Sequence, residues 1–162
     1  MPRLPVNLLD LELAMEFDSN ALLEPQAPYL DLHTGQVIWV WESDEAFAET
    51  TNADPAENRR NREAIAAQPD CFTEITELDT ADDNEMLRDF LRSNWTDDDV
   101  RWRQASEAYR GSVGRWRKTV RHDPTIIHAW HEFEQQAVRR RALAFLAEHG
   151  IEPTASTRID RS

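Results

Sequence analysis

Alternating apolar and polar residues in the first half of the chain predict β-strands. Two such segments, residues 29–32 and 36–41, flank a short turn at residues 33–35 and are typical of a β-hairpin. Gly35 is expected to take the positive φ that closes this turn with a bulge. The second segment is apolar on both faces, which indicates a central strand. Residues 71–75 predict a third strand, so that the three strands form a small antiparallel sheet.

Apolar residues at three- and four-residue steps predict a short helix before this hairpin, over residues 8–17. Asn7 is in place to cap this helix, and Val6 and Leu11 occupy the two positions of a hydrophobic staple. The apolar stripe of the helix is expected to contain Leu9, Leu13, Ala14 and Phe17. Residues 42–68, which are rich in acidic residues and then in arginines, predict a mobile acidic loop followed by an exposed helix.

From residue 79 onward the apolar period is helical throughout, and it predicts four helices. Asp82 or Asp83 is expected to cap the first helix, Thr96 the second, and Asp123, which precedes a proline, the last. Gly150 is expected to end the last helix. The residues expected to face inward are Met86, Leu87, Phe90, Leu91, Val100, Trp102, Ala105, Tyr109, Val113, Trp116, Val120, Ile126, Ile127, Trp130, Phe133, Ala137, Val138, Phe145 and Leu146.

These elements predict an α+β fold, in which an N-terminal helix and a small antiparallel sheet pack with a C-terminal bundle of about four helices. At 162 residues the chain is long enough to bury a core as one domain. We therefore expect a single domain over residues 1–153, with a sheet lobe at 1–78 and a helical lobe at 79–153. Residues 154–162 are polar and predict a disordered tail.

Composition favours a cytoplasmic protein. Cys71 is the single cysteine, so no intrachain disulfide can form, and its place in a predicted strand is typical of a small buried residue. The longest uninterrupted apolar run, residues 37–41, is far shorter than the roughly 20 residues that span a bilayer. Acidic residues interrupt the N-terminal segment before a signal-type stretch develops. We expect no membrane partner.

Charge is distributed very unevenly along the chain, whose net charge is −13. Residues 1–100 contain 24 of the 31 acidic and 6 of the 18 basic residues, a balance of −18. Residues 101–162 contain 7 acidic and 12 basic residues, a balance of +5. Because a block of one sign attracts surfaces of the opposite sign, this asymmetry bears on binding partners more than on the fold.

Basic and aromatic residues alternate between residues 101 and 121, and this segment is the strongest candidate binding surface in the sequence. Arginines and aromatic rings together can bind phosphates and unstacked bases. The candidate binding residues are Arg101, Arg103, Arg110, Arg115, Trp116, Arg117, Lys118 and Arg121. The competing interpretation is structural, because Trp102, Tyr109 and Trp116 recur at the spacing of a helical core. In that case the arginines form a solvated face or pair with the acidic half, and we favour this interpretation.

Three consecutive arginines lie on the last predicted helix. Arg139 and Arg140 project away from its apolar stripe and could extend the basic surface. Arg141 projects into the stripe, as does Glu134, seven residues earlier. Because charges on an inward face are usually paired, we expect Arg141 and Glu134 to pair with each other or with the acidic half.

No catalytic, metal or cofactor motif of any strength is present in the sequence. His128 and Glu132 lie one helical turn apart, but no His-Glu-x-x-His arrangement and no third ligand accompany them. Asp31, His33 and Thr34 lie beside a tight turn, where Asp and Thr commonly bond their own backbone. None of the four glycines belongs to a phosphate-binding pattern. We therefore expect no enzyme, no metal and no cofactor.

The hairpin and a C-terminal block resemble one family. Residues 29–37, Tyr-Leu-Asp-Leu-His-Thr-Gly-Gln-Val, resemble the Tyr-Leu-Asp-Leu-x-Thr-Gly-x-Val hairpin of the bacterial uncharacterised protein family 0158. The C-terminal block of that family is similar to Arg115-Trp116-Arg117-Lys118, Pro124, Trp130, Phe133, Arg139, Phe145-Leu146 and Gly150-Ile151-Glu152-Pro153. Where the family has Ala-Phe-Arg-x-Phe-Lys, this chain has Val113 in place of an aromatic residue and Gly114 in place of an arginine. The resemblance implies the fold and a bacterial origin, and no reaction.

The charge pattern supports two hypotheses from different functional classes. The first is a non-enzymatic protein-interaction or regulatory module, such as an inhibitor, an antitoxin-like factor or a nucleic-acid mimic, whose acidic half binds a basic protein surface. The alternative is nucleic-acid binding through the Arg/Trp-rich face of residues 101–121. A polyanion would have to approach past the acidic half, so we favour the first hypothesis.

Overall fold

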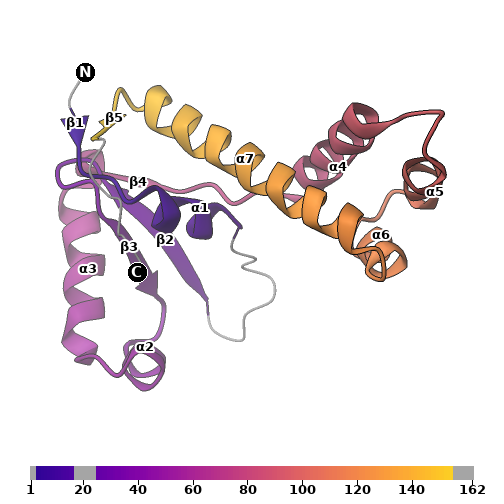
Figure 1. Ribbon diagram of the computed structural model, residues 1–162. Helices are drawn as coiled ribbons and strands as arrows, with labels where there is room; N and C mark the ends of the chain where they lie inside the picture. The colour runs from indigo at the N-terminus through magenta and orange to yellow at the C-terminus, as the bar shows by residue number, and fades with distance from the viewer. Residues whose placement is uncertain (1–2, 17–24, 155–162) are drawn as a thin grey trace, which may run out of the picture. The chain divides into compact units, whose positions relative to one another are not determined.

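The computed structural model of the chain describes residues 3–16 and 25–154 (Figure 1). The chain forms two compact units. The first, called the sheet unit below, contains residues 1–77 and 142–162, and the second, the helical unit, contains residues 78–141. An N-terminal helix, a small antiparallel sheet and a helical C-terminal region confirm the predicted α+β class.

The sheet unit contains three antiparallel strands in the order β3-β2-β4. β2 (Gln26–Asp31) and β3 (Val37–Trp41) form the predicted hairpin. β4 (Phe72–Glu74) pairs with the other edge of β2, with Tyr29 opposite Glu74. The prediction of a small antiparallel sheet is thus confirmed.

Side chains as well as the backbone hold the hairpin turn. Asp31 Oδ1 accepts hydrogen bonds from the backbone N–H groups of His33 (2.8 Å) and Thr34 (3.1 Å). Thr34 Oγ1 accepts a hydrogen bond from the backbone N–H of Gln36 (3.3 Å). Gly35 has a φ of +79°, as predicted. Asp31, Thr34 and Gly35 are therefore structural turn residues.

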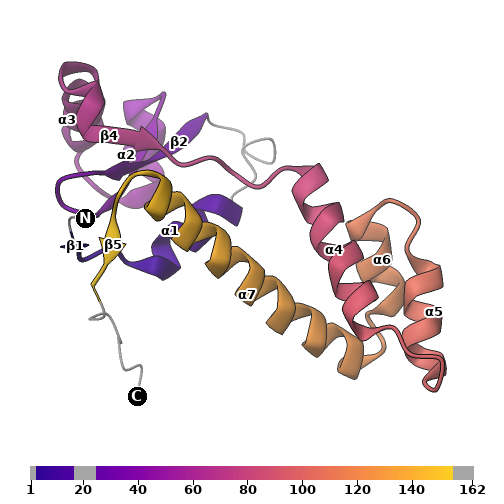
Figure 2. The same ribbon diagram turned by 90° about the horizontal axis from the view of Figure 1, so that it is seen from above.

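β3 lies at an edge of the sheet, so the expectation of a central strand is wrong. Helices cover its two apolar faces instead, since α1 (Leu8–Glu16), α2 (Asp44–Thr51) and α3 (Pro55–Ala67) all contact β3. α3 lies on one face of the sheet and α1 on the other (Figures 1 and 2). An apolar pattern indicates whether the two faces of a strand are covered. The position of the strand in the sheet depends instead on which strands its backbone groups are hydrogen-bonded to.

Residues 42–68 fold into two helices, so the predicted mobile loop is wrong. Ser43 caps α2 and Asp54 caps α3, each by accepting a hydrogen bond from the backbone of the first turn. The acidic residues that suggested a loop lie partly in these first turns, where carboxylates stabilise a helix. α3 is largely exposed, as predicted, but its Asn58 is fully buried.

α1 is capped by Asn7, as predicted, through bonds from Leu9 N (3.0 Å) and Asp10 N (3.2 Å) to Asn7 Oδ1. Its buried residues are Leu11, Ala14 and Met15. The expected apolar stripe is therefore mostly wrong, because Leu9 and Leu13 are 52% and 55% exposed. Phe17, the last residue of that stripe, lies outside the described residues.

Two short strands join distant parts of the chain in the sheet unit. β1 (Arg3–Leu4) pairs in parallel with β5 (Glu152–Pro153), and they lie side by side in both views (Figures 1 and 2). The backbone N–H of Thr154 extends the pairing by donating to the Leu4 carbonyl (3.0 Å). Thr154 was expected in the disordered tail, and the rest of that tail lies outside the described residues.

The helical unit contains α4 (Thr80–Asn94), α5 (Val100–Ala108), α6 (Val113–Val120) and most of α7 (Pro124–Glu148). About four helices were expected, and these four confirm that prediction. α7 continues from the helical unit into the sheet unit. Residues 142–153, which we expected in the helical lobe, belong to the sheet unit.

The helix caps differ from those expected. Asp79 Oδ1 accepts a hydrogen bond from Asp82 N (2.8 Å), and Asp82 Oδ2 accepts one from Asp79 N (3.1 Å), which makes Asp79 the cap of α4. Asp82 and Asp83 belong to the helix itself. Asp99, rather than Thr96, caps α5. Where several Asp and Thr residues precede a helix, each satisfies the capping pattern, so the sequence does not distinguish between them.

Aromatic rings meet at the centre of the helical unit, and they confirm the predicted helical spacing of the aromatic residues. Val100, which was expected to face inward, is 51% exposed. The ring centroid of Phe90 lies 5.6 Å from that of Trp102, 6.1 Å from Trp116 and 5.2 Å from Trp130, all with edge-on geometry. Trp116 and Trp130 lie 5.6 Å apart and are at most 1% exposed. Helices α4, α5, α6 and α7 therefore share one core.

Candidate functional site

The aromatic residues of the predicted binding surface pack inward. Trp116 is fully buried, and its indole Nε1 donates to the Ala105 carbonyl (2.9 Å). The hydroxyl of Tyr109 donates to Asn84 Oδ1 (2.6 Å). The assignment of Trp116 to a binding surface is therefore wrong, because a ring enclosed in the core presents no face to a ligand. The structural interpretation of these rings is confirmed.

Two charged residues expected on the inward face of α7 are paired. Arg141 Nη1 donates to Asp82 Oδ1 (3.0 Å), so Arg141 pairs with the acidic half, as one of the two expectations had it. Glu134 pairs with Arg117 of the basic half, which is neither of the two expected partners. The Arg117 guanidinium lies 5.8 Å from the ring centroid of Trp130. The backbone hydrogen bond from Asp79, followed by the charge of Arg141, lowers the pKa of Asp82.

The other predicted binding residues lie at the surface. Arg101 is exposed and bonded to Asp99 (3.3 Å), and this hydrogen bond is the main cause that lowers the pKa of the Asp99 carboxyl. The remaining exposed basic residues of the prediction are Arg103, Arg110, Arg115, Lys118, Arg121, Arg139 and Arg140. Arg117 is exposed too, although it is held by Glu134. Trp116, the one aromatic residue of the predicted set, is buried, so these exposed basic residues have no exposed aromatic partner from that set.

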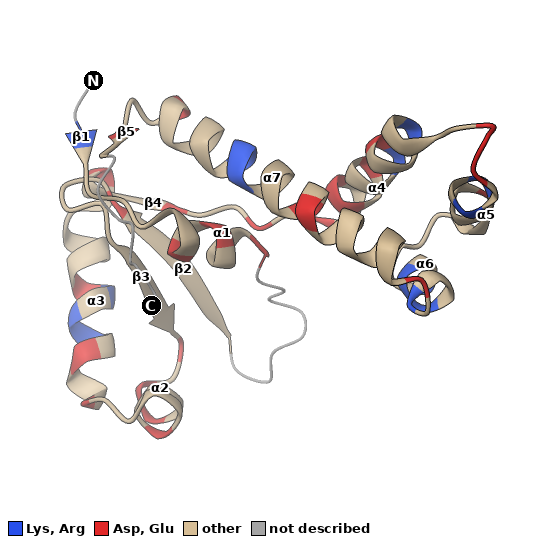
Figure 3. Cartoon of the chain, viewed as in Figure 1, with Lys and Arg blue, Asp and Glu red and all other residues tan. Residues whose placement is uncertain are grey.

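The two units divide the charge differently from the two halves of the sequence. Residues 78–141 contain twelve acidic and twelve basic residues, so the helical unit has a net charge of zero. The other 19 acidic and 6 basic residues belong to the sheet unit, whose net charge is 6 − 19 = −13. Figure 3 shows acidic and basic residues together on the helices of the helical unit. The sheet unit therefore carries the whole net charge of the protein.

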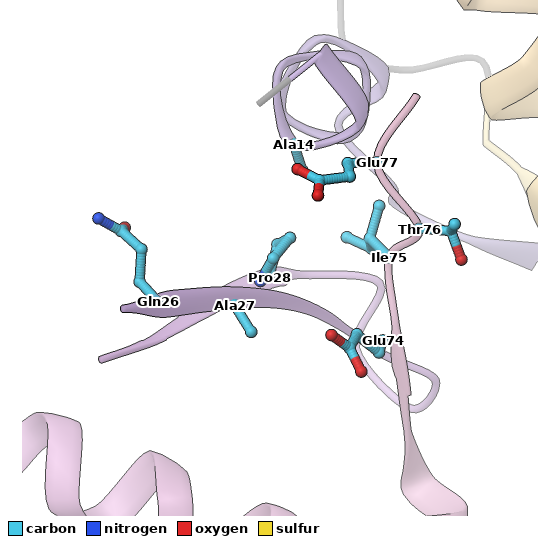
Figure 4. A pocket seen from close by; sticks show the side chains of 8 residues that line it. All are labelled: Ala14, Gln26, Ala27, Pro28, Glu74, Ile75, Thr76 and Glu77. Atoms are coloured by element: carbon cyan, nitrogen blue, oxygen red, sulfur yellow. The ribbon is translucent and has the colours of Figure 1, made fainter. Parts of the chain in front are cut away.

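A cavity of about 370 Å³ opens in the sheet unit where the β2–β4 ladder ends (Figure 4). The last ladder bond runs from Ile75 N to the Pro28 carbonyl (3.0 Å). Proline has no N–H, so Pro28 cannot return the second bond of this pair, and the ladder stops here. The cavity is lined by Ala14, Gln26, Ala27, Pro28, Glu74, Ile75, Thr76 and Glu77.

Two carboxylates belong to the lining of this cavity. Figure 4 shows Glu77 beside Ala14 of α1 and Glu74 on the opposite side of the strands. Burial, and then the negative charge of Glu74, raise the pKa of Tyr29, which pairs with Glu74 across the strands. Carboxylate acceptors beside apolar walls suit a cationic group on an apolar stem, such as the side chain of arginine or lysine.

Histidine and cysteine residues do not assemble a metal site within residues 3–16 and 25–154. His128 Nε2 and Glu132 Oε1 lie 3.3 Å apart, and both side chains are strongly exposed. His149 Nε2 lies 3.1 Å from Thr73 Oγ1. Cys71 is half-buried at the end of a 3₁₀ turn (η2, Pro69–Cys71), so its expected place within a strand is wrong.

Among the described helices, none combines the length and the apolar character needed to span a membrane. The cytoplasmic location stays a prediction.

The residues that carry the resemblance to the bacterial family 0158 occur in both units. The hairpin residues 29–37 lie in the sheet unit, and the C-terminal block begins in α6 and continues along α7 to β5. Membership in that family stays a prediction. No protein-family model, no curated protein and no solved structure matches this chain.

Proposed function

We propose that this protein is a non-enzymatic interaction module whose sheet unit binds a basic surface of another protein. The observation that carries the proposal is the location of the net charge, which is −13 for the sheet unit and zero for the helical unit. A field of one sign speeds the encounter with surfaces of the opposite sign and repels nucleic acid and anionic membranes. An inhibitor, an antitoxin-like factor or a nucleic-acid mimic would use such a surface.

Helices α2 and α3 carry more exposed carboxylates than arginines. Asp44 contacts Arg62 Nη2 (3.1 Å) and Arg59 Nε (3.7 Å), so one half-buried carboxylate engages two of the three arginines of α3. Exposed carboxylates remain at Glu42, Glu45, Glu49, Asp54, Glu57 and Glu63. Their fields add at the surface because few basic residues in the unit oppose them.

The cavity beside Glu74 and Glu77 supports the same function. Its volume of about 370 Å³ accommodates an arginine or lysine side chain, whose stem would contact Pro28 and Ile75. A carboxylate that meets such a cation inside a recess is less screened by salt than one on an open surface. The recess therefore offers a specific contact within a surface that otherwise attracts by charge alone.

Polylysine of defined length tests the proposal. We expect the protein to bind it with an affinity that falls as salt is raised, since screening weakens contacts between exposed charges. Reversal of two sheet-unit charges, Glu49→Lys with Glu63→Lys, should weaken binding more than Glu85→Lys with Glu107→Lys in the helical unit. Both double variants change the net charge by the same amount. Equal losses, or no binding by the wild type, would overturn the proposal.

Nucleic-acid binding is the second candidate, and the exposed basic residues of helices α5, α6 and α7 are the observation that favours it. Exposed arginines and lysines bind phosphates without any base contact. The zero net charge of the helical unit and the burial of Trp116 weaken this candidate. We therefore prefer the acidic surface as the site of function.

A further inference from the structure

The three-stranded sheet has two outer edges, and only one of them is paired within the described residues. In the order β3-β2-β4, strands β3 and β4 each have a neighbouring strand on one side only. At the edge of β3, the carboxamide of Asn58 bonds to both backbone groups of Trp41. Among the described residues, no strand pairs with the edge of β4 that faces away from β2, here called the outer edge of β4. A free strand edge is a template for pairing with another extended chain.

The hydrogen bonds between β4 and β2 show which backbone groups lie on the outer edge. Leu32 N donates to the Cys71 carbonyl (2.9 Å). Ile75 N donates to the Pro28 carbonyl (3.0 Å), so residues 71 and 75 both direct backbone groups toward β2. Because every second residue of an antiparallel strand bonds to the same neighbour, the N–H and the carbonyl of Glu74 point away from β2.

The outer edge of β4 therefore offers the N–H and carbonyl of Glu74 together with the carbonyl of Phe72. The Phe72 N–H is not available, because it donates to the Pro69 carbonyl. An added strand can bond to both backbone groups of Glu74 through a single residue. The side chain of that residue would lie on the same face of the sheet as the Glu74 side chain, since directly opposite residues share a face.

Charge determines which side chain suits this position. Glu74 is exposed, and it belongs to the unit with the net charge of −13. A lysine or arginine opposite Glu74 would form a cross-strand pair of opposite charges, which stabilises a sheet, whereas an acidic residue there would destabilise it. The outer edge of β4 thus favours a basic segment in an extended conformation.

We propose that the outer edge of β4 is the docking site for an extended basic segment of the partner, which adds a strand to the sheet. This step rests on the proposed function, and it names the structural form in which the partner presents its positive charge. In recognition by strand addition, the backbone hydrogen bonds supply affinity and alternate side chains supply specificity. The strand order becomes β3-β2-β4-partner.

The Glu74 carboxylate argues against a second copy of this chain as the occupant. If β4 paired with β4 of a second copy around Glu74, the two Glu74 side chains would lie opposite each other, and like charges at that position destabilise a sheet. The net negative charge of the two sheet units would also oppose their approach. A basic segment meets neither obstacle.

A peptide of about eight residues that alternates lysine and threonine tests the docking site in fluorescence anisotropy titrations against the full chain. Its control carries a methyl group on every backbone nitrogen, so it has the same side chains and charge but no N–H to donate. We expect the unmethylated peptide to bind about tenfold more tightly than the methylated one. Equal affinities of the wild type for the two peptides would overturn the proposal.

Glu74→Pro should abolish the preference for the unmethylated peptide, because proline removes the outward N–H and leaves the bonds to β2 in place. Glu74→Gln is the matched control, since it removes the charge and retains the N–H. It should weaken the binding of both peptides and keep the preference between them. Circular dichroism checks that both variants are folded. A preference that survives in Glu74→Pro, or that is lost in Glu74→Gln, would overturn the docking site.

Amide hydrogen exchange of the wild type, followed by NMR, locates the contact without any substitution. The Glu74 N–H should exchange more slowly when the unmethylated peptide is bound, because a hydrogen-bonded amide is protected. Unchanged exchange at Glu74 in the presence of bound peptide would overturn the proposed site.

The two peptides also separate this proposal from the one on which it rests. If both bind equally and Glu49→Lys with Glu63→Lys weakens both, the docking site on β4 fails and the acidic surface stands. If the unmethylated peptide binds more tightly and those charge reversals change neither affinity, the proposed acidic function fails and the docking site stands.

Discussion

The carboxamide of Asn58 pairs with both backbone hydrogen-bonding groups of Trp41. Asn58 Oδ1 accepts from Trp41 N, and Asn58 Nδ2 donates to the Trp41 carbonyl, each at 2.9 Å. Nδ2 also donates to Asp44 Oδ1 (2.7 Å). One side chain therefore occupies the outer edge of β3 as a neighbouring strand would, and it attaches that edge to α2 and α3.

Asn58→Ala should destabilise the protein by about 2–4 kcal/mol, because two buried backbone groups of Trp41 lose their partner. Asn61→Ala is the matched control, since Asn61 lies on the same helix and is only half-buried. Urea denaturation of the two variants measures the difference in the free energy of unfolding. An equal loss in the free energy of unfolding for the two variants would show that the hydrogen bonds of Asn58 do not stabilise the protein more than the side chain of Asn61 does.

Asp44 should make stability depend on pH in the acid range. The hydrogen bond from Asn58, and then the charges of Arg62 and Arg59, hold the pKa of Asp44 below its ordinary value of 3.8. A carboxyl with a lowered folded-state pKa stabilises the fold above its unfolded-state pKa, and this contribution is lost as the pH falls through the folded-state value. The stability difference between the wild type and Asp44→Asn should be constant from about pH 5 to 7 and shrink below about pH 4. Thermal melts across that range measure it, and a difference that stays constant down to about pH 2 would contradict the assignment.

Gly35→Val should destabilise the sheet unit by about 2–4 kcal/mol for two separable reasons. The residue has a φ of +79°, and a Cβ there would lie 3.1 Å from Val6 Cγ2 and 3.2 Å from Leu4 Cβ. Gly111→Val measures the cost of the positive φ alone. Gly111 has a φ of +84°, and, its chain neighbours aside, no atom of the described residues lies within 4 Å of a Cβ placed there. We expect the Gly111 variant to lose about 1–2 kcal/mol in the same denaturation assay. A smaller effect at Gly35 than at Gly111 would contradict the close approach to Leu4 and Val6.

Trp130→Ala should cost about 3–5 kcal/mol, since it removes a large side chain that is 1% exposed. Trp95→Ala is the control, because Trp95 is 47% exposed and its loss opens no cavity. Far-ultraviolet circular dichroism and tryptophan fluorescence should follow one transition if residues 1–153 behave as a single domain, as expected from the sequence. Two well-separated transitions would contradict the single-domain prediction.

Nucleic acid should bind weakly or not at all at physiological salt. Mobility-shift titrations of single- and double-stranded DNA at low and physiological salt test this, with Arg115→Glu and Arg117→Glu as the paired variant. Because Arg117 is already held by Glu134, the two substitutions should have unequal effects on any residual binding. Tight, salt-sensitive binding that the double variant loses would favour the alternative function.

Local patterns predicted local structure well. The hairpin and its turn at Gly35, the Asn7 and Asp123 caps and the periodic core around Trp130 are confirmed, because each depends on neighbours within a few residues. Caps failed where several Asp and Thr residues competed for one helix start. The stripe of α1 failed because leucines lie on both sides of that helix, and nothing in the sequence shows which side the sheet will cover.

Long-range features could not be predicted from periodicity. The pairing of β1 with β5 involves two residues on each side, too few for a pattern, and the edge position of β3 depends on which strands donate to it. The division of charge between the two units also depends on long-range packing, so the sequence pattern did not predict it. Residues 79–99 belong to the acidic half of the sequence, but they fold with the arginines that follow them.

The β1–β5 pairing also sets an order of assembly during synthesis. A chain leaves the ribosome from its N-terminus, and domains usually fold in that order. Here residues 78–141 emerge before Glu152 and Pro153, so the helical unit is complete while the sheet unit still lacks the strand that pairs with Arg3 and Leu4. The sheet unit, which contains the N-terminus, is thus the later of the two to complete its fold. In a nascent chain halted before residue 152, the helical unit should be folded and the sheet unit should lack the β1–β5 pairing.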